Sequence, residues 1–285
     1  MVSQTQNGVA GVNRATDASP QPSNASRPCI GIVAAFRWEI SSLMRQASRH
    51  TSRNVSYNSS TPHRIDPPHA AANPEPSENK RPDPGRCALL RDGTPVVIAI
   101  SGAGAGNSFR AAQRLAAEFP LGGLVTLGFA GGLIPGLRAG DVVLADVVID
   151  QDSQERFACS TDLLPVRFNR RGNLLSAGAV IISSEEKFRL GEKWQAVAVD
   201  MESAGVARAA AAAGVPFCAV KSITDSADES LSIDFSRCQR EDKNFSFWAI
   251  ACQGLSTLNG ARDLWRLARN ARRAASSLAA AIGGA

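Results

Sequence analysis

Histidine is scarce in this chain of 285 residues, with only three copies, at His50, His63 and His69. All three fall in one stretch that is rich in Ser, Asn and Pro and has no apolar periodicity. A catalytic triad or a Cys–His pair in the folded core is therefore not available, because both need an imidazole base. A histidine-based metal site is excluded on the same ground. We expect no metal and no other cofactor.

Closely spaced cysteines are also missing. The six cysteines are scattered and no two have Cys-x-x-Cys spacing, which argues against zinc and thioredoxin-like sites. No apolar run reaches the ~20 residues of a membrane-spanning helix. Residues 1–28 lack the apolar core of a signal peptide. These absences favour a reducing, cytoplasmic location.

Aromatic residues make up only 6% of the chain, which is too few for an all-β sandwich. The net charge is +5, but much of the excess comes from arginines after residue 260. Because the basic character is confined to that end, we expect no nucleic-acid partner.

Short apolar segments alternate with helical segments along most of the chain. This alternation predicts a three-layer α/β/α domain over residues 29–236, with a mixed central sheet covered by helices. Composition predicts a disordered leader over 1–28, a disordered insertion over 50–85 and a helical, basic tail over 237–285. The predicted strands span 29–36, 87–101 (a hairpin with its turn at Asp92-Gly93), 124–127, 141–148, 179–182, 196–199 and 217–223.

Two of the predicted strands end in acidic residues. Residues 196–199 lead to Asp200 and Glu202, and residues 217–223 lead to Asp225. In open α/β sheets, the carboxyl ends of the strands line the ligand crevice. We therefore expect Glu202 and Asp225 to lie at the mouth of one cleft, on neighbouring strands.

Three glycines follow another predicted strand, at Gly102, Gly104 and Gly106. Their spacing departs from the dinucleotide fingerprint, whose third glycine would fall on Asn107, and no Walker lysine follows. Two interpretations remain: the glycines permit a tight strand-to-helix turn, or they let a ribose approach the backbone.

Four segments together resemble the nucleoside phosphorylase/nucleosidase superfamily, most closely its 5′-methylthioadenosine/S-adenosylhomocysteine nucleosidase branch. They are IGIVAAFRWEI (30–40), VVIAISGAGAG (96–106), LVTLGFAGGLIPGLRAGDVVLAD (124–146) and VDMESAGVARAAAAAGVPFCAVKSITDSAD (199–228). The resemblance implies an enzyme that cleaves the N-ribosidic bond of an adenosine-type nucleoside and releases the purine.

The resemblance also implies roles for single residues. Asp225 matches the general acid that protonates the base, and burial at the end of its strand would favour the protonated form. Glu39 matches the residue that orients the attacking water. The implied substrate-binding residues are Met201 and Glu202 at the ribose, Ser101 and Gly102 near the water, Ile181 and Ile182 beside the base, and Thr224. The family often has Phe at the first of the two isoleucine positions and Asp at the position of Ala179.

The nucleophile is open at this point. Superfamily phosphorylases hold phosphate through arginines, one of them in an Arg-x-Gly-Ser/Thr segment. The matching stretch here is Thr126 to Phe129, which has neither the arginine nor the hydroxyl. A phosphate without a guanidinium partner would be poorly held, so hydrolysis is favoured, although Arg37 could compensate. The alternatives are a phosphate-dependent phosphorylase and a non-catalytic nucleoside sensor.

The C-terminal tail is amphipathic, with leucines and alanines along one helical face and arginines around the rest. One interpretation is a helix packed on the core or across a dimer, and we expect a homo-oligomer. The other is an interfacial helix that makes peripheral contact with anionic lipid at the inner face of the membrane. The tail resembles that of hopanoid-associated phosphorylase-like proteins, which act on a nucleoside joined to a polycyclic lipid (adenosylhopane).

Overall fold

The computed structural model describes residues 28–48, 86–90, 92–230 and 258–283. The predicted leader up to residue 27 and the predicted insertion over 50–85 lie outside the described residues. The three histidines and the part of the tail before residue 258 lie outside them as well.

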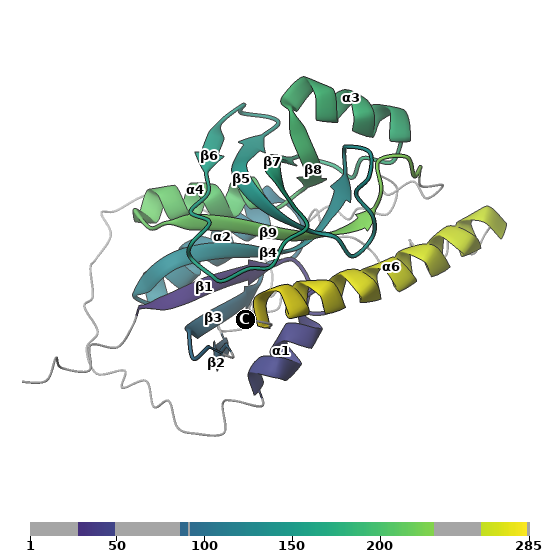
Figure 1. Cartoon of the computed structure of the whole chain (residues 1–285). Helices are drawn as coiled ribbons and strands as arrows, with labels where there is room; N and C mark the ends of the chain where they lie inside the picture. The colour runs from purple at the N-terminus through teal and green to yellow at the C-terminus, as the bar shows by residue number, and fades with distance from the viewer. Residues whose placement is uncertain (1–27, 49–85, 91, 231–257, 284–285) are drawn as a thin grey trace, which may run out of the picture.

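Nine strands form one mixed sheet (Figure 1). They are β1 (Cys29–Ala34), β2 (Arg86–Leu89), β3 (Pro95–Ile100), β4 (Leu121–Gly132), β5 (Val142–Asp150), β6 (Arg156–Ala158), β7 (Arg170–Ser176), β8 (Ala196–Asp200) and β9 (Phe217–Asp225). The order is β2-β3-β1-β4-β8-β7-β5-β6, and β9 pairs with both β4 and β5. The described helices are α1 (Ser41–Ser48), α2 (Ala105–Glu118), α3 (Ser184–Trp194), α4 (Ser203–Ala213) and α6 (Leu258–Gly283).

Helices cover both faces of the sheet, which confirms the predicted α/β/α architecture. On one face, α2 and α4 bury small and aliphatic side chains such as Leu115 and Val206 in the main core cluster. On the other face, Leu43 of α1 and Leu278 of α6 share a second cluster with strand residues such as Val125. A third, smaller cluster includes Leu190 of α3.

The strand directions bring several chain segments to one edge of the sheet. β4 runs parallel to β1 and to β9, so the carboxyl ends of these three strands lie together. β8 runs antiparallel to the end of β4, where Gly131 pairs with Val199. β4 thus lies between β8 and β9, and the expectation that Glu202 and Asp225 follow neighbouring strands is wrong. They still meet, because Gly131 pairs with Asp225 on its other side.

The strand predicted over 179–182 is also wrong. The strand in this region is β7, which pairs with β5 and β8 and begins with two exposed arginines. Because β7 begins with these charged residues, its sequence lacks the apolar pattern by which the other strands were predicted. The apolar residues 179–182 lie after the strand and lead to Ser183, the N-cap of α3. Three of them, Ala179, Val180 and Ile181, line the cleft described below and do not pair with a strand.

Candidate active site

A cavity of about 200 Å³ opens at the edge of the sheet where β1, β4, β8 and β9 end. Four carboxylates, Glu39, Asp200, Glu202 and Asp225, line it. The other described residues around it are Ala35, Phe36, Trp38, Ala103, Phe129, Ala130, Gly131, Ala179, Val180, Ile181, Val199, Met201 and Thr224. The cleft therefore combines acidic groups with apolar walls, and no described lining residue is a lysine or arginine.

Glu39 lies in the loop between β1 and α1 and is only 6% exposed. Its carboxylate accepts a hydrogen bond from the Phe36 amide at 3.0 Å. Burial, reinforced by the charge of Glu202, raises the pKa of Glu39 to about 8. The carboxylate also packs against β4, where a Cβ on Gly128 would lie 3.1 Å from its Oε2. Glycine at 128 thus gives Glu39 the room to face the cleft.

Glu202 lies two residues after the end of β8, and its side chain contacts the glycine-rich turn. Its Oε1 accepts a hydrogen bond from the Gly104 amide at 2.8 Å, and its backbone carbonyl accepts one from the Ser108 hydroxyl at 2.7 Å. Burial, together with the charge of Asp200, raises the pKa of Glu202. Gly104 has a φ of +92°, so the turn that offers its amide requires glycine.

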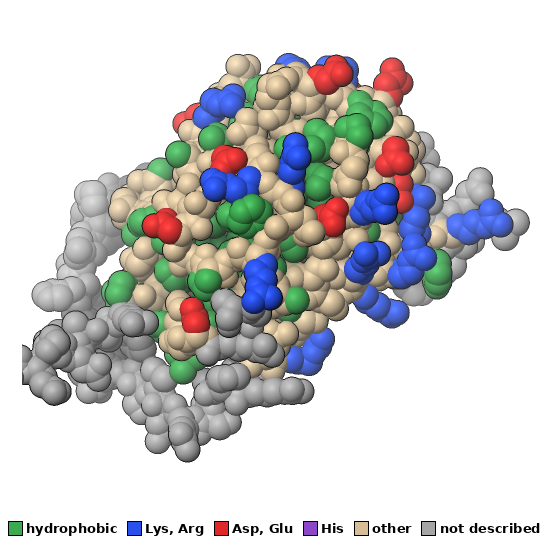
Figure 2. Space-filling model, viewed as in Figure 1, with side chains coloured by type: hydrophobic (Ala, Val, Ile, Leu, Met, Phe, Trp, Pro, Cys, Tyr) green, Lys and Arg blue, Asp and Glu red, His purple; other side chains and the backbone are tan. Residues whose placement is uncertain are grey.

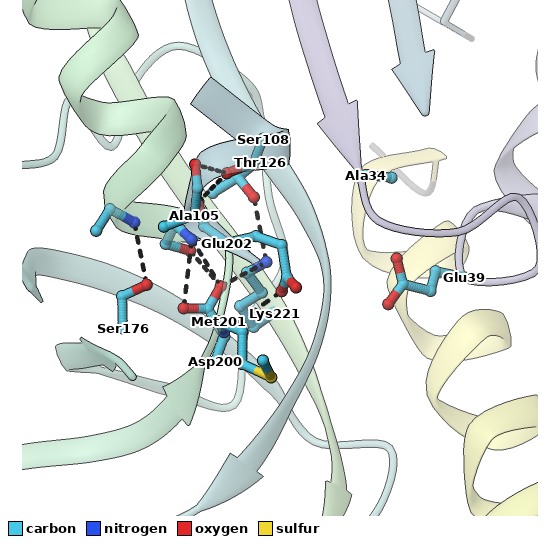
Figure 3. A network of polar contacts seen from close by, with 12 residues as sticks. Ala34, Glu39, Ala105, Ser108, Thr126, Ser176, Asp200, Met201, Glu202 and Lys221 are labelled. Atoms are coloured by element: carbon cyan, nitrogen blue, oxygen red, sulfur yellow. Dashed lines mark hydrogen bonds and ion pairs between the residues drawn. The ribbon is translucent and has the colours of Figure 1, made fainter. Parts of the chain in front are cut away.

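A buried lysine lies beneath these acids, in a polar network that Figure 3 shows. Lys221, in the middle of β9, forms an ion pair with Asp200 at 2.8 Å and donates to the Thr126 hydroxyl at 3.1 Å. Burial alone would lower the pKa of Lys221, but Asp200 and Glu202 more than offset this and raise it. Glu39 lies across from the network in Figure 3, and the positive charge of Lys221 partly offsets the rise in the pKa of Glu39.

Sequence reasoning missed Lys221, although the sequence carries a signal for it. A lysine is rarely buried unless it is paired, so a lysine inside the apolar run of 217–223 calls for a buried acidic partner. Asp200 is that partner, and it also accepts hydrogen bonds from the Ser203 amide and hydroxyl.

Asp225, at the end of β9, is held by a second buried lysine. Its Oδ2 lies 2.6 Å from the Nζ of Lys187, and its Oδ1 accepts a hydrogen bond from the Thr224 hydroxyl at 2.7 Å. The sequence-based expectation considered only the burial of Asp225 and did not include this lysine. Gly131 is needed here, because a Cβ at that position would lie 3.1 Å from Oδ2.

The other predicted site residues divide into two groups. Met201, Thr224 and Ile181 line the cavity with the three acids. Ser101, Gly102 and Ile182 are not among its described lining residues. The Ser101 and Gly102 amides donate to carbonyl oxygens at the end of β1, at 2.9 Å and 3.0 Å, which places this turn directly behind the cleft.

A second and larger cavity, of about 800 Å³, adjoins the cleft. The two share a junction of five residues, Phe36, Trp38, Phe129, Val180 and Thr224. At this junction the Trp38 ring stacks on Phe36 and meets Phe129 edge-on, with ring centroids 5.8 Å and 5.0 Å apart. The remaining described lining residues are Ser41, Ser42, Arg45, Leu264, Leu267, Ala268, Ala271, Arg272, Ala275 and Ser276. The larger cavity is thus enclosed mainly by apolar side chains of α6 and by the aromatic junction, with polar residues of α1 on another side.

Helix α6 packs on the site from Leu264 onwards. Asn270 donates a hydrogen bond to the Thr224 carbonyl at 2.9 Å, next to Asp225, and Leu278 and Ile282 are buried in the core. The beginning of the helix extends past the body of the protein (Figure 1), and Trp265 there is 66% exposed. Figure 2 shows Lys and Arg side chains gathered along this helix.

In the described part of the chain, no group of three or more His, Cys, Asp or Glu side chains is arranged to hold a metal ion. None of the described helices is long and apolar enough to cross a membrane.

A family model described as the phosphorylase superfamily matches residues 61–247. The chain belongs to this superfamily. A 5′-methylthioadenosine/S-adenosylhomocysteine nucleosidase from Geobacillus thermodenitrificans is 25% identical over 172 residues, covering 51% of this chain and 73% of that protein. One from Mycobacterium tuberculosis is 27% identical over 192 residues, covering 51% of this chain and 75% of that protein.

Solved structures of the superfamily share the fold. The nucleosidase of the same name from Helicobacter pylori has a TM-score of 0.56 at 18% identity, over 90% of this chain and 99% of that one. The futalosine hydrolase of Helicobacter pylori has a TM-score of 0.54 at 18% identity, over 88% and 95%. The predicted family is confirmed, and with it the prediction of an enzyme of the nucleoside phosphorylase and nucleosidase family.

Proposed function

We propose that this protein hydrolyses the N-ribosidic bond of an adenosine-type nucleoside that carries a bulky apolar substituent. The observation that carries the proposal is the pair of adjoining cavities. The smaller holds four carboxylates near the ends of the sheet strands, and the larger is a mainly apolar chamber whose aliphatic wall comes from α6.

The small cavity has the groups that N-ribosidic cleavage requires. The purine must leave in a protonated form, the positive charge that develops on the sugar must be stabilised, and a nucleophile must be activated. We assign proton donation to Asp225, ribose hydroxyl binding to Glu202 and Met201, and orientation of the attacking water to Glu39. The apolar residues Ile181 and Phe129 then border the base.

Water, and not phosphate, is the nucleophile in this proposal. The described residues of the small cavity offer no guanidinium or ammonium group to a phosphate dianion. Arg37, which could have compensated, is exposed and is not among the described lining residues of either cavity. Phe129 contributes an aromatic ring to the junction at a position where phosphorylases of the superfamily have a hydroxyl.

The large cavity supports the apolar substituent. Ligand pockets usually have volumes of about 300–1,000 Å³, and this one joins the ribose cleft through an aromatic junction. A group joined to the ribose could pass Trp38 and lie along Leu264, Leu267 and Ala271. A methylthio group would leave most of this space unfilled, whereas a polycyclic lipid such as the hopane of adenosylhopane would fill it.

The direct test is base release by the purified full-length protein. Methylthioadenosine, S-adenosylhomocysteine and an adenosine with a polycyclic apolar group at C5′ are incubated in phosphate-free buffer, and free adenine is separated and quantified. Adenine release with a free sugar as the second product is expected. Tight nucleoside binding without release from any of them would favour a nucleoside sensor and contradict the proposal.

We also propose peripheral membrane contact through the exposed beginning of α6. There Arg262, Arg266 and Arg269 accompany the exposed Trp265, and each basic residue near an anionic surface contributes about 1 kcal/mol. Such a contact would bring a lipid-linked nucleoside to the large cavity from the inner face of the membrane. The protein should sediment with phosphatidylserine vesicles at low salt and be released at high salt, whereas a Trp265→Ser/Arg269→Ser variant should stay in solution.

A homo-oligomer likewise remains a prediction, which the mass of the protein in solution tests.

A further inference from the structure

Lys187 is the most deeply buried charged side chain next to the cleft, and the roles assigned so far do not use it. It lies in the first turns of α3 with 0% exposure. Its Nζ donates to Asp225 Oδ2 at 2.6 Å, to the Ser226 carbonyl at 3.0 Å and to the Glu229 carbonyl at 2.8 Å. Three acceptors match the three protons of an ammonium group, so the side chain is fully satisfied in its charged form.

Stability alone is a weak explanation for such a pair. Desolvating two charges costs about as much as their attraction returns, and well-packed apolar replacements are often neutral or stabilising. The ion pair involves Oδ2 of Asp225, the carboxylate assigned to proton transfer. Its Oδ1 accepts a hydrogen bond from the Thr224 hydroxyl. Both oxygens are therefore oriented before a substrate arrives.

We propose that Lys187 is a positioning residue for the proton-transfer step, acting through Asp225. This inference rests on the proposed N-ribosidic hydrolysis. The proton moves from Asp225 to N7 of the purine, and the electron pair of the C1′–N9 bond goes to the base. Water then attacks C1′, and its proton goes to the Glu39 carboxylate. Lys187 stabilises the Asp225 carboxylate that remains, and its hydrogen bond to Oδ2 keeps that carboxylate facing the base.

The proposal predicts that kcat changes and KM does not when the charge is removed. In Lys187→Gln, kcat should fall by about 10-fold to 1,000-fold, because the carboxylate left after proton transfer has no counter-charge. KM for the nucleoside should stay within a few-fold of the parent's value, because Lys187 is not among the described lining residues of the small cavity. Lys187→Arg, which keeps the positive charge, should keep most of the parent's kcat.

A matched control lies on the same helix. Lys193 is exposed and lies over the Trp194 ring, so Lys193→Gln should keep the parent's kcat and KM. If Lys187→Gln does not fold, as judged by circular dichroism and its melting temperature, Lys187→Met takes its place in the same measurements.

A binding measurement adds a readout that does not need turnover. The base analogue 9-deazaadenine carries a hydrogen on N7 and so donates to an ionised Asp225, whereas adenine presents a lone pair there. Titration calorimetry should show that the parent prefers 9-deazaadenine and that Lys187→Gln loses about 10-fold of this preference. The proposal is overturned if Lys187→Gln folds and keeps both the parent's kcat and its base preference. If the parent itself releases no base, the proposed function fails instead.

Discussion

The two adjoining cavities differ in what builds them. The small one is made at strand ends, where parallel pairing of β1, β4 and β9 brings Glu39 and Asp225 together over buried lysines. The large one is walled chiefly by α6, which supplies aliphatic side chains along one face, with the polar residues Ser41, Ser42 and Arg45 of α1 beside it. In the proposed function, the sheet carries bond cleavage and the helices select the substrate, and each role can be tested by mutation separately.

The largest effect is expected from Asp225→Asn, which keeps the shape of the side chain but cannot donate an acid proton. Loss of general-acid help should lower kcat by about 10²-fold to 10⁴-fold for every adenosine-type substrate. The variant should still bind the apolar-substituted nucleoside, because the large cavity is unchanged. A kcat within a few-fold of the parent would remove Asp225 from the mechanism.

Glu39→Gln comes next and gives a pH signature. Because burial raises the pKa of Glu39 to about 8, the carboxylate needed to orient water becomes more populated as the pH rises toward that value. The kcat/KM of the parent should therefore rise between pH 6 and 8, and Glu39→Gln should lose about 10²-fold in rate together with this rise. A parent profile that is flat over this range would contradict the assignment.

Glu39 should affect stability with the opposite pH dependence: the activity of the parent rises with pH, whereas its free energy of unfolding falls. Glu39 binds its proton more tightly in the folded state than at its ordinary pKa of 4.5, so its contribution to the free energy of unfolding is lost as the pH rises from about 4.5 to about 8. Relative to the parent, Glu39→Gln should be more stable at pH 8.5 than at pH 5, as urea unfolding would measure. No change in the relative stability between these pH values would show that Glu39 is not buried as described.

Filling the large cavity should change selectivity and spare bond cleavage. In Ala271→Trp, the indole would occupy space along α6 near Leu267, and kcat/KM for an apolar-substituted nucleoside should fall by about 10-fold to 100-fold. The kcat/KM for methylthioadenosine should change little. Ala280→Trp, at an exposed position of the same helix, is the matched control and should behave like the parent for both.

The smallest effect is expected from phosphate. Because the described lining of the small cavity presents no basic side chain, adding inorganic phosphate should leave the rate of base release unchanged, and the sugar product should be free ribose or its derivative. Separation of the sugar products would show this. A 1-phosphate product would mean that another cation supplies a phosphate site.

Much of this arrangement could be predicted from the sequence, because it rests on local patterns. Glu39, Glu202 and Asp225 each follow a strand-like apolar run. The four segments that resemble the family occur in the family's order, and they identified these three acids as site residues. The alternation of strands and helices was enough for the α/β/α layers. These features depend on residues close together in the chain.

The remaining features depend on contacts between distant segments. Lys187 meets Asp225 across 38 positions, and nothing next to it in the sequence shows that α3 turns this lysine inward. The placement of β4 between β8 and β9 could not be predicted either, since strand order is set by packing and not by local propensity. The large cavity forms because α6 packs beside the start of α1. The periodicity of the tail predicts a helix but does not predict where that helix packs.

The central claim is that one cavity cleaves and the other selects. It is tested most directly by measuring kcat/KM for adenine release across 5′-alkylthio adenosines of increasing chain length, ending with a polycyclic group. The account predicts that kcat/KM rises with the apolar size of the substituent in the parent and stays nearly flat in Ala271→Trp. A kcat/KM that is highest for methylthioadenosine and falls steadily with size in the parent would contradict it.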